Sequence, residues 1–316
     1  MENLDLVLSS EEKAVFALRA LYGKYGYAQY KMSKFEEYDL YVKNKDFLVS
    51  DNIITFTDTD GKLMALKPDV TLSIIKNSKD LLEGLTKVYY NENVYRVSKG
   101  TKSFKELMQV GLECLGAVDR DAITEVLLLA SLSLDKISDN YLLDISSLDV
   151  AKGIMDDAGI SYQGEKEILS FLAEKNVQGV ALVCDREGVS ADKAEMVKKL
   201  VTVYGSPKKV MGELKALKVS DKTAAAISEL DRVIDGITER GIVDKVNIDF
   251  SVVNNMKYYN GIVFKGFVEG IPTGLLSGGQ YDKLMEKMGK KSRAIGFAVY
   301  LDELGKLERQ VKMEKE

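Results

Sequence analysis

The N-terminal part of the chain has the spacing of an amphipathic helix. Ser9, followed three residues later by Glu12, forms the pattern of a capping box, which marks a helix start. Beyond it, apolar side chains recur every three or four positions and fall on one helical face: Val15, Leu18, Tyr22 and Tyr25. The pattern predicts a helix over residues 9–25 that packs its apolar face on a sheet.

A short hairpin is predicted next. Residues 53–56 and 63–66 have strand-like composition and flank Asp60-Gly61, a pair that favours the positive backbone angles of a tight turn. A helix can start at Thr71, directly after this hairpin.

Strand and helix patterns then follow one another to the C-terminus. Strand composition occupies residues 86–96, 107–116, 142–145, 246–253, 258–268 and 293–299. Helical spacing occupies residues 119–137, dominates residues 164–240 and returns from Leu301. Strands on both sides of a helical segment, with mostly antiparallel connections, predict an α+β fold with one central, mainly antiparallel sheet flanked by helices. We expect a core in two parts, residues 1–163 and 241–316, separated by a helical insertion.

Composition places the chain among ordinary globular proteins. Of its 316 residues, 46% are apolar and 29% are charged, and no apolar run reaches the roughly 20 residues that cross a bilayer. The N-terminus has no basic stretch before an apolar one, so we expect no signal peptide, no membrane association and a cytoplasmic location. The net charge is −5 and the lysine pairs are scattered among acidic residues, which argues against nucleic-acid binding.

The chain contains no histidine, which excludes whole classes of chemistry. An imidazole metal ligand, an imidazole base and a Ser-His or Cys-His nucleophile are all impossible. The two cysteines, Cys114 and Cys184, lie far apart in apolar surroundings, which predicts buried reduced thiols rather than a disulfide or a metal site. We therefore expect no metal and no cofactor.

Several segments resemble a known family, in the order that the family has. They are LKPDVTLS (residues 66–73), YYNENVYRVSKGTKSFKELMQVGLECLG (89–116), DFSVVNNMKYYNGIVFKGFV (249–268), SGGQYD and RAIGFAVYLDEL. Together they resemble the catalytic core of histidyl-tRNA synthetase, a class II aminoacyl-tRNA synthetase. The resemblance is strongest to its non-aminoacylating relatives, the regulatory subunits of ATP phosphoribosyltransferase. It implies a class II synthetase-like core without the anticodon-binding domain of the enzyme.

The resemblance also implies a site for a free amino acid. Asp69 takes the position of a family glutamate that meets the ammonium group, and Glu113 that of the partner of the imidazole ring. The full set of matching positions is Asp69, Thr71, Arg96, Gln109, Glu113, Tyr258, Tyr259 and Tyr281. Arg96 matches the arginine of the family's second motif, and the three tyrosines match aromatic positions that line the pocket.

Taken one at a time, these residues have plainer interpretations. Glu113 could form an internal ion pair with Arg96 and hold no ligand. Tyr258 and Tyr259 on a strand could lie one in the core and one on the surface. Gly278-Gly279 alone predicts a turn.

Two arginines that hold ATP in the enzyme are missing from the matching positions. Asn254 stands where an arginine of the histidine-specific motif is expected, and Asp302 replaces the arginine of the third motif. Activation of an amino acid needs cations that stabilise the charge developing on the transferred phosphate. An anion at such a position repels the triphosphate, so we expect the chain to have no catalytic residues for adenylation.

The resemblance therefore implies a regulatory role in histidine biosynthesis. We expect a non-catalytic regulatory subunit that pairs with a short-form catalytic subunit of ATP phosphoribosyltransferase and has histidine as its effector. By resemblance, a homodimer within a hetero-oligomer is expected. Histidine could bind in the synthetase-like pocket or at a subunit interface. The alternatives are a truncated histidyl-tRNA synthetase or amino-acid ligase that keeps adenylation, and a stand-alone histidine sensor or tRNA-binding module.

Overall fold

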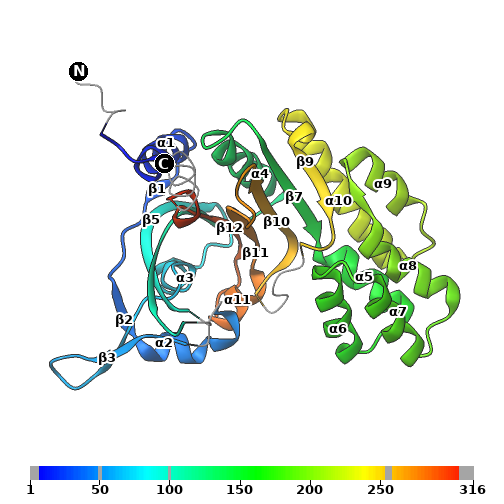
Figure 1. The fold of residues 1–316 in the computed structure, drawn as a ribbon, viewed down its shortest axis with the longest axis horizontal. Helices are drawn as coiled ribbons and strands as arrows, with labels where there is room; N and C mark the ends of the chain where they lie inside the picture. Colours follow the sequence, from blue (N-terminus) through cyan, green and yellow to red (C-terminus); the bar gives the residue numbers. More distant parts are fainter. Residues whose placement is uncertain (1–6, 49–51, 99–100, 253–257, 306–316) are drawn as a thin grey trace, which may run out of the picture.

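A twisted nine-stranded sheet forms the centre of the computed structural model, which describes residues 7–48, 52–98, 101–252 and 258–305 (Figure 1). The strands run in the order β1-β5-β6-β12-β11-β10-β7-β9-β8. All neighbours pair antiparallel except β1 with β5 and β7 with β9. The bounds are β1 Ala28–Gln29, β5 Leu85–Val97, β6 Phe104–Gly116, β7 Tyr141–Ser147, β8 Tyr204–Gly205, β9 Val246–Asp249, β10 Asn260–Val268, β11 Leu276–Gln280 and β12 Arg293–Tyr300. The predicted α+β fold with a mainly antiparallel sheet is confirmed.

One face of the sheet is covered by α1 (Ser10–Lys24) and α4 (Arg120–Asp135). Both helices begin at capped ends, and Ser9 and Glu12 form the predicted capping box of α1. Alternate residues of β6, Val110, Leu112 and Cys114, point into this core and are fully buried. The residues between them therefore face the opposite side of the sheet, because side chains alternate along a strand.

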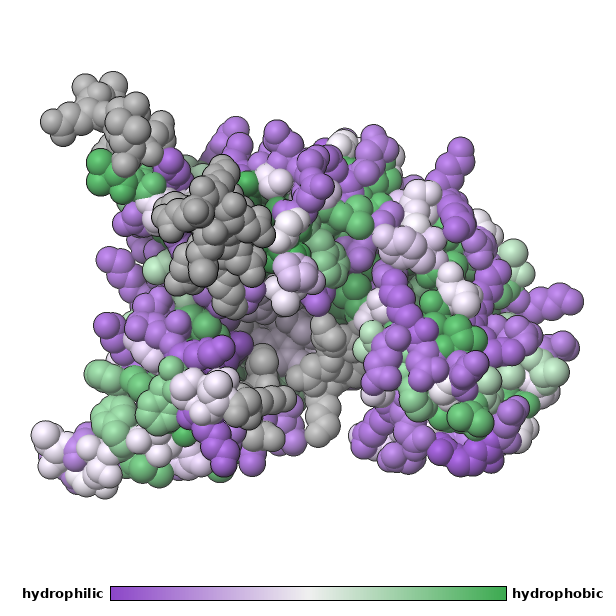
Figure 2. Space-filling model, in the orientation of Figure 1, coloured by the Kyte–Doolittle hydropathy of each residue, from purple (hydrophilic) through white to green (hydrophobic). Residues whose placement is uncertain are grey.

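The opposite face carries a smaller group of elements. These are α2 (Tyr38–Lys43), α3 (Thr71–Asn77), α11 (Asp282–Lys287) and a separate three-stranded sheet of β2 (Phe35–Glu37), β3 (Thr55–Thr57) and β4 (Leu63–Leu66). The rings of Phe35 and Phe56 in the small sheet meet edge to face, with centroids 5.2 Å apart, and remain exposed. Figure 2 shows hydrophobic surface over β2 and β3 at the lower left.

Most of the remaining helices lie together beside β7 and β9 (Figure 1). They are α5 (Leu148–Ala158), α6 (Tyr162–Ala173), α7 (Val177–Arg186), α8 (Ala191–Thr202), α9 (Pro207–Lys215) and α10 (Asp221–Glu239). We call α6 to α10 the helical segment. Short 3-10 helices span Lys45–Phe47 and Val243–Lys245. The boundaries at 163/164 and 240/241 stay a prediction.

Four details differ from the sequence-based expectations. The β3–β4 turn is a five-residue loop in which Gly61, and not Asp60, has a positive φ, because Asp58 accepts hydrogen bonds from the backbone of Asp60 and Lys62. Gly278 and Gly279 lie within β11, although as a pair they predict a turn. β9 ends at Asp249 rather than 253, because its carboxylate accepts from Ser251 N in a turn. β10 begins at Asn260, two residues later than expected.

The two thiols lie in the interior of the protein. Cys114 and Cys184 are free and buried, as predicted. Among the described residues, no helix is both long and apolar enough to cross a membrane. In the same part of the chain, no three carboxylates or thiols gather where they could hold a metal ion. The helix expected from Leu301 falls mostly outside the described residues.

Candidate amino-acid-binding site

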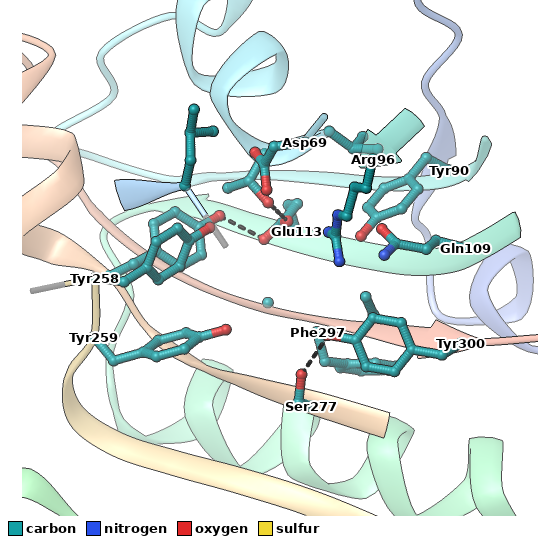
Figure 3. A pocket seen from close by; sticks show the side chains of 16 residues that line it. Asp69, Tyr90, Arg96, Gln109, Glu113, Tyr258, Tyr259, Ser277, Phe297 and Tyr300 are labelled. Carbon is teal, nitrogen blue, oxygen red and sulfur yellow. Dashed lines mark hydrogen bonds between the residues drawn. The ribbon is translucent and has the colours of Figure 1, made fainter. Parts of the chain in front are cut away.

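All eight positions that the resemblance assigns to an amino-acid site line one cavity of about 390 Å³ (Figure 3). The cavity lies on the face of the sheet opposite α1 and α4. Its size is in the range of pockets that enclose small molecules. Residues more than 200 positions apart in sequence thus meet at a single place.

The floor of the cavity is built from strand β6 and its neighbours. Gln109 and Glu113 of β6 line the cavity, Gly111 lies between them on the same face of the strand, and Glu113 is paired across the sheet with Gly296 of β12. Position 296 requires glycine because the Glu113 carboxylate occupies the space that a side chain would need. A Cβ on Gly296 would lie 1.7 Å from Glu113 Oε2. Gly111 likewise leaves room for the hydroxyl of Tyr90, which would lie 2.4 Å from a Cβ. Gly296 and Gly111 therefore leave the space on the sheet that the Glu113 carboxylate and the Tyr90 hydroxyl occupy.

Glu113 is the most deeply buried acidic group of the cavity, with 2% of its surface exposed. Its Oε1 accepts a hydrogen bond from Thr71 Oγ1 at 2.7 Å, and its Oε2 accepts one from the hydroxyl of Tyr281 at 2.5 Å. Burial raises the pKa of Glu113 to about 8, and the two hydroxyl donors oppose the rise. The alternative in which Glu113 pairs with Arg96 is wrong, since no ion pair joins these two described residues.

Asp69 and Arg96 stand at the edge of the cavity nearest α3. Asp69 Oδ1 accepts a hydrogen bond from Leu72 N at 2.9 Å, at the start of that helix. Burial raises the pKa of Asp69, while the Leu72 amide and the guanidinium of Arg96 oppose the rise. Arg96 Nε donates to Pro68 O at 3.3 Å, and its terminal nitrogens have no partner among the described residues. Figure 3 shows the guanidinium pointing into the cavity beside Tyr90 and Gln109.

Three tyrosines form an aromatic wall. The rings of Tyr258 and Tyr259 are 4.6 Å apart, and Tyr258 lies 5.8 Å from Tyr281. The interpretation in which one of Tyr258 and Tyr259 lies on the surface is wrong: Tyr258 is buried, Tyr259 is half-buried, and both line the cavity. The hydroxyl of Tyr259 points into the cavity in Figure 3.

The structure adds lining residues that the sequence did not single out. Tyr90 faces the cavity from β5, where it is paired with Gly111. Ser277 and Tyr300 border the other side and hydrogen-bond to each other at 2.6 Å. The resemblance assigned Gln109 and Glu113; strand alternation would add Tyr90 once the β5–β6 register is known, because its partner Gly111 lies between these two residues on the same face.

Of the two positions at which the family's arginines are missing, only one lies among the described residues. Asn254 lies outside the described residues. Asp302 directly follows β12 and Leu301, is half-buried, and is not among the described residues that line the cavity. Its negative charge thus sits just beyond the strand that carries Gly296 and Tyr300.

Comparison with known proteins identifies the family. The family model described as histidyl-tRNA synthetase matches residues 7–304. The chain belongs to the histidyl-tRNA synthetase family. The class II synthetase-like core expected from the resemblance is thereby confirmed.

Within the histidyl-tRNA synthetase family, curated relatives named ATP phosphoribosyltransferase regulatory subunit are similar over most of this chain. The protein from Acetivibrio thermocellus is 26% identical over 290 residues, which cover 89% of this chain and 68% of the relative. That from Alkaliphilus metalliredigens is 27% identical over 289 residues, covering 90% and 73%. These names agree with the relatives that the sequence resembles.

Solved structures agree on the fold. An ATP phosphoribosyltransferase regulatory subunit/histidyl-tRNA synthetase from Bacillus halodurans C superposes with a TM-score of 0.82 at 23% identity, covering 94% of this chain and 78% of that chain. A chain of the ATP phosphoribosyl transferase (HisG:HisZ) complex from Thermotoga maritima superposes with a TM-score of 0.71 at 18% identity, covering 92% and 97%.

Proposed function

We propose that this chain is the non-catalytic regulatory subunit of ATP phosphoribosyltransferase, acting with a short-form catalytic subunit in the first step of histidine biosynthesis. The observation that carries the proposal is the convergence of all eight assigned positions on one cavity. The shared name of the curated relatives supports the same role. A biosynthetic subunit of this kind would act in the cytoplasm.

The occupant that we propose for the cavity is free histidine, the feedback effector. Asp69 would accept from the ammonium group, and the free nitrogens of Arg96 would donate to the carboxylate, as a charge-assisted pair. Glu113 would meet an imidazole nitrogen, because a ring nitrogen buried without a partner costs about 1 to 3 kcal/mol. The aromatic wall would pack on the flat ring.

Feedback requires that histidine distinguishes two states of the complex. A ligand shifts an equilibrium only by the difference between its affinities for the two states. Thr71 and Tyr281 belong to different parts of the cavity, α3 and the β11–α11 junction, and both bind Glu113. We propose that the histidine-bound arrangement of this trio favours the inhibited complex.

Adenylation is not expected from this site, because Asn254 and Asp302 stand at the positions where the enzyme has arginines that hold ATP. The test is histidine-dependent exchange of pyrophosphate into ATP. We expect exchange at the background of a protein-free sample. Robust exchange would overturn the non-catalytic assignment and favour the truncated-synthetase alternative.

Assembly with the catalytic subunit is the second test. The short catalytic subunit from the same genome is mixed with this chain, and the mass in solution is measured by light scattering after gel filtration. We expect a hetero-oligomer that contains a homodimer of this chain. Two separately migrating proteins at micromolar concentration would contradict the proposal.

A further inference from the structure

A second cavity of about 240 Å³ lies where the sheet meets the helical segment. Its walls come from β7, from β10, from the turn after β9 and from the loop after α6. Figure 1 shows β7 and β9 bordering the helical segment, and Figure 2 shows the surface hollowed between these two parts. The eight positions assigned above contribute nothing to this cavity.

Four charged side chains line the second cavity, and two of them neutralise each other. Lys175 Nζ lies 2.7 Å from Asp249 Oδ2, and the other oxygen of Asp249 accepts from Ser251 N at 2.8 Å. The Lys175 ammonium also lies 4.7 Å from the centre of the Tyr204 ring. This pair is therefore satisfied without a ligand.

The other two charged side chains, Asp144 and Lys265, form no ion pair with any described residue. They are direct partners across β7 and β10, yet no ion pair joins them. Asp144 is 7% exposed, and its buried Oδ1 finds no hydrogen-bond partner within the described ranges. The Lys265 ammonium lies 5.2 Å from the centre of the Phe267 ring and finds no acceptor in the described part of the chain.

An unpaired buried carboxylate oxygen is costly, because burial removes its water without replacing the lost hydrogen bonds. Burial, followed by the nearby charge of Asp249, raises the pKa of Asp144 to about 6, while the charge of Lys175, a hydrogen bond with the Asn247 side chain and the charge of Lys265 oppose the rise. The Asp144 carboxylate therefore keeps a hydrogen bond with the Asn247 side chain, but it has no ion-pair partner among the described residues and one of its oxygens is unsatisfied. Because Asp144 lines the cavity, it is the group there that a donor from outside the chain would stabilise.

We propose that the second cavity binds a small zwitterionic α-amino acid, whose ammonium group donates to Asp144 and whose carboxylate accepts from Lys265. The two unpaired groups are of opposite sign and lie on one face of adjacent strands, which matches a ligand that carries both charges. Phe267 provides an apolar surface for the ligand's side chain. The inference goes beyond the proposed function, since it requires neither histidine in the first cavity nor a catalytic subunit.

The second cavity lies between the central sheet and the helical segment, so a ligand bound there would contact both. Lys175, in the loop between α6 and α7, reaches Asp249 at the end of β9, beside the unpaired Asp144. A ligand held by Asp144 would therefore sit at the contact between the sheet and the helical segment.

The test is a binding titration on the full chain by calorimetry at pH 8, with each proteinogenic L-amino acid as a probe. Wild-type protein and Glu113→Gln, which alters only the first cavity, should bind at least one amino acid equally well. Asp144→Asn and Lys265→Met should each weaken that binding by about tenfold or more. Asp39→Asn, at an exposed surface carboxylate of α2, should leave it unchanged.

Analogues of the same amino acid test each half of the proposal. The amide, which lacks the carboxylate, and the deaminated acid, which lacks the ammonium, should both bind about tenfold or more weakly to the wild type. The proposal is overturned if all amino-acid binding is lost in Glu113→Gln, or if the amino acid that binds wild type and Glu113→Gln equally well also binds Asp144→Asn and Lys265→Met with unchanged affinity. Binding by none of the probes overturns it equally.

Folding of the key variant can be checked independently. The pKa of Asp144 is raised in the folded chain, so protonation of Asp144 stabilises the fold. This contribution to the free energy of unfolding is fully present below about pH 4 and is lost as pH rises through about 6. Asparagine cannot ionise, so Asp144→Asn does not lose stability at alkaline pH in this way. At pH 8 the melting temperature of the variant should therefore be no lower than that of the wild type. If Asp144→Asn melts at a lower temperature, the amino-acid binding of Lys265→Met becomes the deciding comparison with the wild type.

Discussion

At the scale of single residues, the first cavity depends on a glycine as much as on its charged groups. Gly296→Ala would place a methyl group 1.7 Å from Glu113 Oε2 and 2.5 Å from Leu112 O, where only a shift of the carboxylate or the strand can relieve the overlap. We expect a loss of about 1 to 3 kcal/mol in the free energy of unfolding. Histidine affinity should fall about tenfold or more by calorimetry.

The matched control for this substitution is Gly212→Ala in α9. A Cβ at Gly212 meets nothing within 4 Å, so alanine should be neutral or should stabilise the helix by up to about 1 kcal/mol. If Gly296→Ala binds histidine as tightly as the control does, Glu113 is not a ligand of histidine.

The pKa of Glu113 gives the proposed complex a characteristic pH dependence. Glu113 titrates at about 8 and a free imidazole at about 6.5. In the proposed complex Glu113 and the imidazole would share one proton, so binding would release a proton below about pH 6.5 and take one up above about pH 8. We expect histidine affinity, measured by calorimetry across this range, to be highest between these two values.

Glu113→Gln isolates the contribution of the carboxyl group. The variant cannot ionise, so the fall in affinity that sets in near pH 8 should disappear, while the fall on the acidic side remains. Loss of the ligand's ammonium proton at higher pH affects both proteins alike. An alkaline fall of equal size and position in the variant would show that Glu113 does not exchange a proton with the ligand.

Motif order carried the information that places the assigned residues at one location, whereas their role in binding stays a prediction. Asp69, Gln109 and Glu113 come together as the resemblance implies, even though no local pattern places α3 beside β6. Tyr90 and Ser277 were not predicted, because their orientation depends on which strands pair and in what register. Register is a long-range property that spacing along one strand does not contain.

At the scale of secondary-structure elements, local chemistry determines the ends of helices. In α1, Ser9 accepts from Glu12 N and Glu12 Oε2 accepts from Ser9 N at 2.9 Å, so the capping box is complete. Ser9→Ala should lower the free energy of unfolding in urea by about 1 kcal/mol. Ser190, the N-cap of α8, makes no side-chain capping bond, so Ser190→Ala should cost clearly less. Equal effects of the two substitutions would contradict this account of the cap.

Helices and long strands were predicted well, and short or glycine-rich ones were not. The runs at 86–96 and 107–116 correspond to β5 and β6, because long β-rich sequences fit only a paired strand. β11 was missed because Gly278-Gly279 resembles a turn. In the structure, a Cβ on Gly278 would lie 2.3 Å from Gly296 O and 2.5 Å from Phe297 Cβ. These glycines permit close packing between strands, a requirement that appears only when the sheet is assembled.

At the scale of the whole molecule, the chain combines two different kinds of surface hollow. The first cavity belongs to the synthetase-like core, and its polar groups are largely satisfied by one another: Glu113 by Thr71 and Tyr281. The second lies at the contact with the helical segment and contains an unsatisfied carboxylate oxygen on Asp144. A regulatory subunit could thus respond to an effector within its core and to a ligand at the contact between its parts.

The most direct measurement of the central claim is the rate of phosphoribosyl-ATP formation by the short catalytic subunit from the same genome. It is measured with and without this chain, across a histidine titration, using wild type, Glu113→Gln and Gly212→Ala. We predict that wild type and Gly212→Ala raise the rate and make it sensitive to histidine, whereas Glu113→Gln raises the rate but shifts inhibition to about tenfold or more higher histidine. A rate that no form of the chain changes, with no complex formed, would contradict the account.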